Sequence, residues 1–369
     1  MERSSSPDEV KNVDWISKLP DDVLLMILSR LSTEEAMRTS LVSKRWEHLW
    51  KQMSHLVLDM QRFIDDKEPL DNSNRVATLI TEVLNNHHGH LESCVIDHFT
   101  PQRENGMLNT WIRVLASYPS LEVLELGIVC CPKSGDKLKI ENKKLKLLRV
   151  RFCHHFDGII VSAPSLDILF VEHNSFTRKD VVFTSPRLQF NRKYWAGLSH
   201  VSYNISKEEK SIAHEEFMKT YVKCLSPTAA LAVSVDLMSR TEVERLRQLL
   251  CLWPPEMEEL EISFKDCNGH REEDEYLWEE INNKAPFPNA EFRVGSVWMY
   301  NFSGSEEEFA LASCLVRQGT VVSMMMVKST SYPASKKLKI EAAVAKLQAL
   351  LPDDDDDDEW EGGLIIECF

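Results

Sequence analysis

The residues best suited to metal chemistry are two short groups of histidine and cysteine. Residues 87–90 read HHGH and residues 153–155 read CHH. Imidazole and thiolate bind zinc well, but a zinc site combines two such groups at characteristic spacings. Neither group has a second half at such a spacing, and the first follows a predicted helix, where imidazoles cap carbonyls or face solvent. We therefore predict no metal and no cofactor.

Catalytic motifs are equally scarce. The chain has no GxSxG elbow, HExxH pair or P-loop, and only 12 of its 369 residues are glycine. Nine cysteines, an odd number with no CxxC pair, indicate reduced and mostly buried thiols. The polar N-terminus has no signal-like apolar region, and no stretch of 18 apolar residues occurs. These features favour a non-catalytic cytoplasmic or nuclear protein with no membrane partner.

Charge is concentrated near the C-terminus. The formal net charge is −15, and eight acidic residues fall within 353–361, which leaves −7 for the rest of the chain. Proteins that grip phosphate backbones need a basic face, so this balance argues against a nucleic-acid partner. The acidic run lacks the spaced ligands of a calcium site, and we expect it to stay solvated.

One basic stretch deserves comparison with an anion site. It comprises Lys143, Lys144, Lys146, Arg149 and Arg151. On a concave surface it could bind an anionic small molecule. Acidic residues on neighbouring predicted strands, among them Glu122 and Asp167, oppose its field, so we favour a solvated strand.

The N-terminal region must fold as three short helices. Apolar residues at positions 23, 24, 27, 28 and 31 follow Leu19-Pro20-Asp21-Asp22 in the chain and form one stripe on a predicted helix. Ser32 and Glu35 have the spacing of a capping box that starts a second helix. Leu41 to Trp50 form a third apolar segment with two tryptophans. A unit this small buries little surface, so part of its apolar face should meet another surface.

The same residues resemble an F-box. The runs LPDDVLLMILSRL at 19–31 and SLVSKRW at 40–46, followed by Leu49 and Trp50, match that motif in order over residues 13–55. The resemblance implies docking on a Skp-type adaptor and thereby membership of a cullin-RING ubiquitin ligase. The predicted adaptor-binding residues are Leu19, Pro20, Val23, Leu24, Ile27, Leu28, Leu31, Val42, Trp46, Leu49 and Trp50.

Repeats follow this motif. The pattern L-x-x-L-x-L occurs at 121–126, 145–150 and 166–171, at offsets within the leucine-rich-repeat range of about 20 to 29 residues. Weaker units begin near Leu91, Leu198 and Met257, and helix-like stretches lie between them. We expect a curved solenoid over 56–281 that binds a target protein through the exposed x positions. The candidates are Glu122, Glu125, Lys146, Arg149, Asp167 and Phe170.

The C-terminal part has a different pattern. We predict a strand at 297–302, a helix that starts at a Ser305 capping box and ends at Gly319, a strand at 321–327 and a helix at 335–351. Residues 297–308 resemble the start of an FBD domain, the module that follows F-box and repeat regions in a large plant family. Residues 364–369 are apolar enough to dock back as a short strand. Basic residues 336–339 are consistent with a nuclear-import motif or a charged first helical turn.

Together these patterns predict an α/β protein with an N-terminal three-helix F-box, a leucine-rich-repeat solenoid and a small α+β C-terminal cap. The expected segments are a disordered leader at 1–12, the F-box at 13–55, repeats at 56–281, an FBD-like domain at 285–351 and an acidic tail at 352–369. The expected function is substrate recognition in a Skp-cullin-F-box ubiquitin ligase. The alternative is a repeat scaffold or small-ligand receptor that does not act through ubiquitination.

Overall fold

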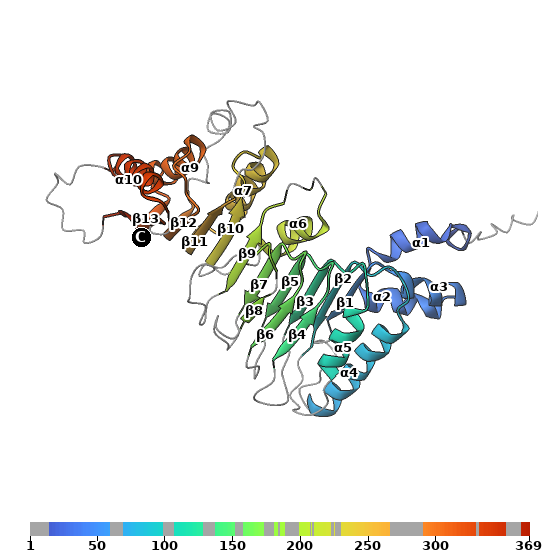
Figure 1. The fold of residues 1–369 in the computed structure, drawn as a ribbon. Helices are drawn as coiled ribbons and strands as arrows, with labels where there is room; N and C mark the ends of the chain where they lie inside the picture. The colour runs from blue at the N-terminus through green and yellow to red at the C-terminus, as the bar shows by residue number, and fades with distance from the viewer. Residues whose placement is uncertain are drawn as a thin grey trace, which may run out of the picture.

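In the computed structural model, three short helices at the N-terminus pack against one end of a long sheet (Figure 1). The described residues are 15–59, 69–98, 107–127, 137–151, 158–172, 181–183, 185–188, 199–206, 208, 210–222, 225, 230–265, 291–329, 332–351 and 363–369. The leader at 1–12, residues 153–155, the predicted boundary between the repeats and the FBD-like domain at 282–284, and the acidic run at 353–361 lie outside them.

The N-terminal helices form where the sequence predicts them. They are α1 (Asp21–Leu28), α2 (Thr33–Arg38) and α3 (Lys44–Leu49). The 3-10 turn η1 (Ile16–Lys18) precedes α1, η2 (Thr39–Leu41) lies between α2 and α3, and η3 (Trp50–Gln52) follows α3. Two aspartates occupy the first turn of α1, where negative charge is favourable. The predicted capping box is present: the Glu35 amide donates to Ser32 Oγ at 3.2 Å, and the Ser32 amide donates to Glu35 Oε2 at 3.0 Å.

The first half of the sheet consists of parallel strands in chain order. They are β1 (His55–Asp59), β2 (Ser93–Asp97), β3 (Val123–Gly127), β5 (Leu147–Arg151) and β7 (Ile168–Glu172). The repeat leucines are in register, since Leu124 pairs with Leu148 and Leu148 with Leu169. The three repeat units therefore form adjacent strands. Three further strands make a separate parallel sheet: β4 (Leu138–Glu141), β6 (Ile159–Ser162) and β8 (Val181–Phe183).

The sheet changes direction once, between β7 and β9. These two strands are antiparallel, with Phe170 opposite Val201, and the strands beyond β9 are again parallel to one another. The second half contains β9 (His200–Asn204), β10 (Ala230–Val235), β11 (Glu256–Phe264), β12 (Arg293–Tyr300), β13 (Val321–Val327) and β14 (Ile365–Cys368). The expectation of a curved solenoid does not include this reversal.

The helices consequently cover opposite faces of the two halves (Figure 1). Right-handed crossovers place helices on one face of a parallel sheet, and reversing the strand direction moves them to the other face. The first half is covered by α4 (Pro69–Asn86) and α5 (Met107–Ala116). The second is covered by α6 (Ile212–Glu216) with the π-helical segment η6 (Phe217–Tyr221), α7 (Arg240–Leu252), α9 (Glu306–Arg317) and α10 (Ala334–Gln348). Two hydrophobic cores result, one on each face.

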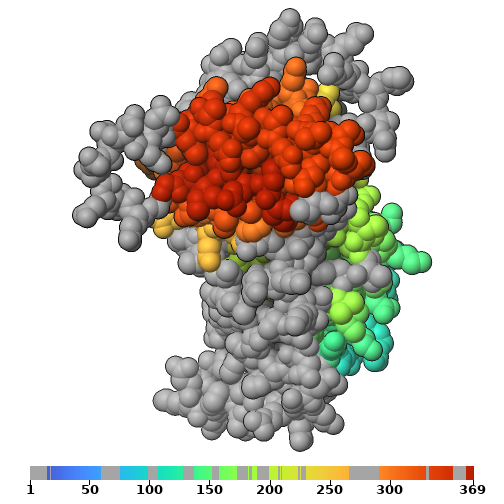
Figure 2. Space-filling view, turned by 60° about the vertical axis from the view of Figure 1, so that its left-hand side comes forward, coloured from blue at the N-terminus to red at the C-terminus, as the bar shows by residue number. Residues whose placement is uncertain are grey.

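The C-terminal strands extend the large sheet instead of forming a sheet of their own. β12 pairs with β11, and β14 docks beside β13 as predicted from its apolar residues. The Ser305 capping box starts α9, and Gly319, with φ +62°, follows the end of that helix. Figure 2 shows these C-terminal residues, in orange and red, packed together at one end of the molecule.

Two observations bear on the predicted class of protein. No helix among the described residues is long and apolar enough to cross a membrane. Four of the nine cysteines are described, and all four are free thiols: Cys94 and Cys314 are buried, whereas Cys251 and Cys368 are half-buried.

Candidate functional site: an apolar surface on the N-terminal helices

The N-terminal helices expose a group of large apolar side chains, which we call the N-terminal apolar surface. Leu41 is 90% exposed and Val42 is 76% exposed, although both lie within an otherwise well-packed helical unit. Scattered exposed leucines are ordinary, but several together indicate an interaction site. The members of the surface are Trp15, Ile16, Met26, Ile27, Leu31, Leu41 and Val42.

The predicted adaptor-binding residues divide into two groups in the structure. Five of them lie in the core of the chain: Leu24, Leu28, Trp46, Leu49 and Trp50. Pro20, Ile27, Leu31 and Val42 are exposed, while Leu19 and Val23 are half-buried. The sequence reasoning did not select Trp15, Ile16, Met26 or Leu41. Periodicity identifies an apolar helix face, but it does not separate the side chains that fill a core from those beside them.

Leu41 and Val42 are held by helical structure on their N-terminal side. The Thr39 amide donates to carbonyl oxygens at the end of α2, and the Val42 amide donates to the Thr39 carbonyl oxygen at 2.9 Å. The two exposed residues therefore lie at the end of a continuous helical segment, α2–η2.

An ion pair joins α1 to α3. Asp21 of α1 pairs with Arg45 of α3, and Arg45 also donates to the Leu19 carbonyl oxygen at 2.6 Å.

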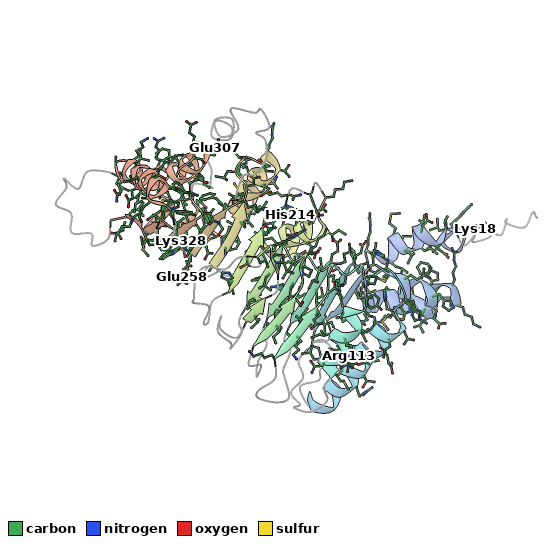
Figure 3. The ribbon with its side chains drawn as sticks, viewed as in Figure 1. Lys18, Arg113, His214, Glu258, Glu307 and Lys328 are labelled. Atoms are coloured by element: carbon green, nitrogen blue, oxygen red, sulfur yellow. The ribbon has the colours of Figure 1, made fainter. Side chains whose placement is uncertain are left out.

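At the outer end of this unit, Trp15 is itself partly covered by a cation. The Lys18 ammonium group lies 4.9 Å from the centre of the Trp15 ring, close enough for a cation–π interaction. Figure 3 labels Lys18 at the end of the N-terminal helices farthest from the sheet. The Trp15 side chain nevertheless stays 71% exposed.

The N-terminal helices are also joined firmly to the sheet. The buried Thr33 side chain accepts a hydrogen bond from the Val57 amide of β1 at 2.7 Å. His87 Nε2 donates to the Met53 carbonyl oxygen at 2.7 Å, and the Gly89 amide donates to the Lys51 carbonyl oxygen at 3.1 Å. One hydrophobic core runs without interruption from these helices into the first half of the sheet.

The target-binding candidates on the repeat strands are mostly buried, which corrects the expectation that the x positions are exposed. Glu125, Arg149 and Asp167 are buried, and Phe170 is inaccessible. The reason is the direction change of the sheet, which brings η6 over this face. The guanidinium carbon of Arg149 lies 4.8 Å from the Phe170 ring and 4.7 Å from the ring of Tyr221 in η6.

A charge network surrounds Arg149. It donates to Glu125 at 3.1 Å and to Glu172 at 2.8 Å, and Arg151 links Glu125 to Asp97 of β2. Buried charges need such pairing because they have lost their water. Gly127 leaves room for this arrangement, since a Cβ atom there would lie 2.9 Å from Arg151 Nε. Each charge of the network has an opposite partner, although the buried Nε of Arg149 has no hydrogen-bond partner among the described residues.

Two of the candidates, Glu122 and Lys146, remain half-buried. Lys146 Nζ lies 3.5 Å from Glu122 and 3.0 Å from Glu208, beyond the direction change of the sheet. Asp167 bonds to Asn204 at 2.8 Å in the same region. Three residues of the basic stretch, Lys146, Arg149 and Arg151, therefore pair with acidic groups, as expected from the acidic residues on neighbouring strands. The strand itself is buried, which corrects the expectation of a solvated strand.

The histidine group at 87–90 serves a structural contact. His87 is buried at the end of α4, with Nδ1 3.1 Å from the Tyr118 hydroxyl. Burial lowers the pKa of His87, which favours the neutral ring. In the part of the chain that the structure describes, no three His, Cys, Asp or Glu residues are grouped to hold a metal ion.

Comparison with known proteins agrees with the N-terminal helices. The F-box domain family matches residues 16–58. F-box protein At1g80960 of Arabidopsis thaliana is 53% identical over 93% of this chain and 89% of that protein. Putative F-box protein At1g67390 of the same plant is 36% identical over 96% of this chain and 92% of its own. F-box/FBD/LRR-repeat protein At1g80470 is 45% identical over only 17% of this chain and 13% of that protein.

The chain belongs to the F-box proteins. F-box domains generally bind Skp-type adaptors of cullin-RING ubiquitin ligases, and F-box proteins are generally non-catalytic substrate receptors. The relatives aligned along the whole chain have no leucine-rich repeat or FBD domain in their names, so both of those assignments stay predictions.

Proposed function

We propose that this protein is a substrate receptor of a Skp-cullin-F-box ubiquitin ligase and that the N-terminal apolar surface binds the adaptor. The observation that supports this assignment most directly is the exposure of Leu41 and Val42 at the end of a rigid helical segment. Burying one such side chain contributes about 1.5 to 3 kcal/mol. Several together can offset the entropy of association, which costs at least about 4 kcal/mol.

The predicted residues that lie in the core contribute indirectly. Leu24, Leu28 and Leu49 hold α1 and α3 in place, so their substitution would unfold the site along with any contact they make. A binding test must therefore use the exposed residues.

The first experiment replaces Leu41 and Val42 together by serine. We expect adaptor affinity to fall at least about tenfold, because two apolar contacts are lost, whereas the free energy of unfolding changes little at positions this exposed. Binding of a purified Skp-type adaptor is measured by isothermal titration calorimetry, and stability by urea unfolding.

Leu338→Ser is the matched control. Leu338 is 67% exposed on α10, far along the chain from the N-terminal helices, and its replacement should leave adaptor binding unchanged. Equal affinity of the wild type and the Leu41/Val42 variant would remove the docking assignment.

Once held by the adaptor, the protein acts by proximity: it keeps a target near a ubiquitin carrier, so that the transfer becomes effectively intramolecular. We propose that the sheet binds this target, and the half-buried Glu122 and Lys146 are the remaining candidates at its repeat strands. Proximity labelling in cells with the Leu41/Val42 variant tests this, because a receptor that folds but cannot join the ligase should retain its undegraded targets.

A further inference from the structure

The segment α2–η2 has two ends with different neighbours. At its start, Thr33 is buried against the edge strand β1 and accepts the Val57 amide at 2.7 Å. At its end, Leu41 and Val42 are the two most exposed large apolar side chains of the described residues. Continuous helical hydrogen bonds join the ends. A partner that binds Leu41 and Val42 therefore contacts a helical segment whose other end packs against the edge strand β1.

The hydrogen bond at Val57 lies on the outer side of β1. β1 is the first strand of the sheet and pairs on its other side with β2. An edge strand presents unpaired amides that need another partner, and here the helical unit supplies one. The buried Ala36 of α2 and Leu56 of β1 belong to the same hydrophobic core, so the contact between the two elements is apolar as well as polar.

We infer that adaptor binding and the packing of β1 against the N-terminal helices are coupled through α2–η2. We call β1 closed when the hydrogen bond between the Val57 amide and Thr33 is formed, and open when it is broken. The inference rests on the proposed function, because it concerns the same surface. When β1 opens, Thr33 loses its partner and α2 loses its support, so Leu41 and Val42 are held less well. The adaptor then has a higher affinity for the closed form, which is the condition for shifting the equilibrium toward it. By linkage, the effect is reciprocal: loosening β1 weakens adaptor binding by the same factor.

The coupling gives the receptor a state that depends on assembly. Without an adaptor, β1 opens more often, and its own buried residues Leu56 and Leu58 are exposed more often. With the adaptor bound, the first half of the sheet is held closed. A target surface on that half is then most ordered when the protein is part of the ligase.

Hydrogen exchange of the wild-type chain tests the inference directly. The amide of Val57 is observed with and without a purified Skp-type adaptor. We expect adaptor to slow its exchange by about tenfold, within the usual range of coupling between sites. The amide of Val233, in the middle of β10 in the second half of the sheet, serves as the internal control and should exchange at the same rate in both samples.

A variant tests the reverse direction. Thr33→Val keeps the shape of the side chain and removes the acceptor of the Val57 amide, and we expect adaptor affinity to fall about five- to tenfold although no docking residue has changed. Ser120→Ala is the matched control: it removes one hydroxyl hydrogen bond from the same half, to the Leu91 carbonyl oxygen at 2.9 Å, without touching the helical unit. It should bind the adaptor as the wild type does.

The outcomes separate the two proposals. If the adaptor binds but the exchange of Val57 is unchanged, the coupling is wrong and the docking assignment stands. If the wild type does not bind the adaptor at all, the docking assignment is wrong and the coupling falls with it. Should Thr33→Val fail to fold, as judged by circular dichroism, the exchange experiment on the wild type decides alone.

Discussion

Among single residues, His214 shows how burial changes the chemistry of a side chain. It lies on α6 above the strands (Figure 3), with Nδ1 in a short hydrogen bond to the Tyr203 hydroxyl. Burial lowers the pKa of His214 from 6.5 to about 4, and the nearby positive charge of Arg245 adds to the shift. The ring is therefore neutral under ordinary conditions and serves the packing of α6.

This shift predicts a loss of stability in acid. The unfolded chain protonates His214 as the pH falls through about 6.5, whereas the folded chain resists protonation until the pH nears 4. The unfolded state thus binds more protons in this range, so the free energy of unfolding falls as the pH falls. His87, whose pKa is also lowered, contributes in the same direction.

We expect His214→Gln to flatten this pH dependence between pH 6.5 and 5. Urea unfolding at several pH values measures it, and the slope is informative even if the variant is less stable at neutral pH. A slope identical to that of the wild type would show that His214 is not the group responsible.

The local sequence predicted the helix caps correctly, but it did not predict which side chains on the strands are exposed. The Ser32 and Ser305 capping boxes and the turn at Gly319 were all predicted, because each depends on residues within a few positions of one another. The burial of Arg149 and Phe170 was not predicted. It depends on η6, which lies 51 residues beyond Phe170 at Tyr221 and is brought over the strand only by the fold.

At the scale of elements, the junction between the N-terminal helices and the sheet depends on a glycine. Gly89 follows α4 and lies so close to η3 that a Cβ atom there would be 2.5 Å from the Cα atom of Gln52. No side chain other than hydrogen fits, because the obstacle is backbone. The histidine-rich segment at 87–90 thus takes part in the packing of α4 against η3.

Gly89→Ala should therefore separate α4 from η3. We expect the free energy of unfolding to fall by about 3 kcal/mol, the upper part of the range for overpacking, as measured by urea unfolding. Gly363→Ala is the control glycine, since nothing lies within 4 Å of its added Cβ, and it should change stability little. A tolerated alanine at position 89 would mean that the junction adjusts.

The strands were predicted better than their arrangement. The L-x-x-L-x-L units became β3, β5 and β7 in matching register because alternate leucines must share one buried face. Basic residues 336–339 lie in the first turn of α10, where Lys336 stacks on Tyr332 at 4.2 Å. These residues are thus helical, as the second interpretation predicts, and the import motif stays a prediction.

At the scale of the whole molecule, the two hydrophobic cores lie on opposite faces of the sheet and share three of its strands. β3, β5 and β7 contribute to both: Leu124, Leu148 and Leu169 to one core and Val123, Leu147 and Ile168 to the other. Tyr221 from the second half packs on Arg149 from the first, and Glu208 pairs with Lys146 across the same divide. The halves are therefore parts of one folded unit.

Tyr221→Ala should weaken this unit strongly. Removing a fully buried aromatic ring costs about 3–5 kcal/mol, and here it also uncovers the Arg149 network. Tyr221→Phe keeps the ring and removes the hydroxyl, which is hydrogen-bonded to the Glu125 carboxylate. It should cost about 1.5–3 kcal/mol, the value of a hydrogen bond to a charged group. Urea unfolding of both variants distinguishes ring packing from the hydroxyl; equal losses would contradict the importance of the ring.

The sequence by itself determined the N-terminal helices, the repeat strands, the C-terminal elements and the resemblance to F-box proteins, because all of these depend on local spacing and composition. Only the tertiary structure decided which apolar residues of the F-box are exposed, that the sheet reverses after β7, and that four of the six expected target-binding residues are buried. The physical reason is that exposure and strand direction depend on contacts between segments distant in the chain, and periodicity within one segment contains no information about them.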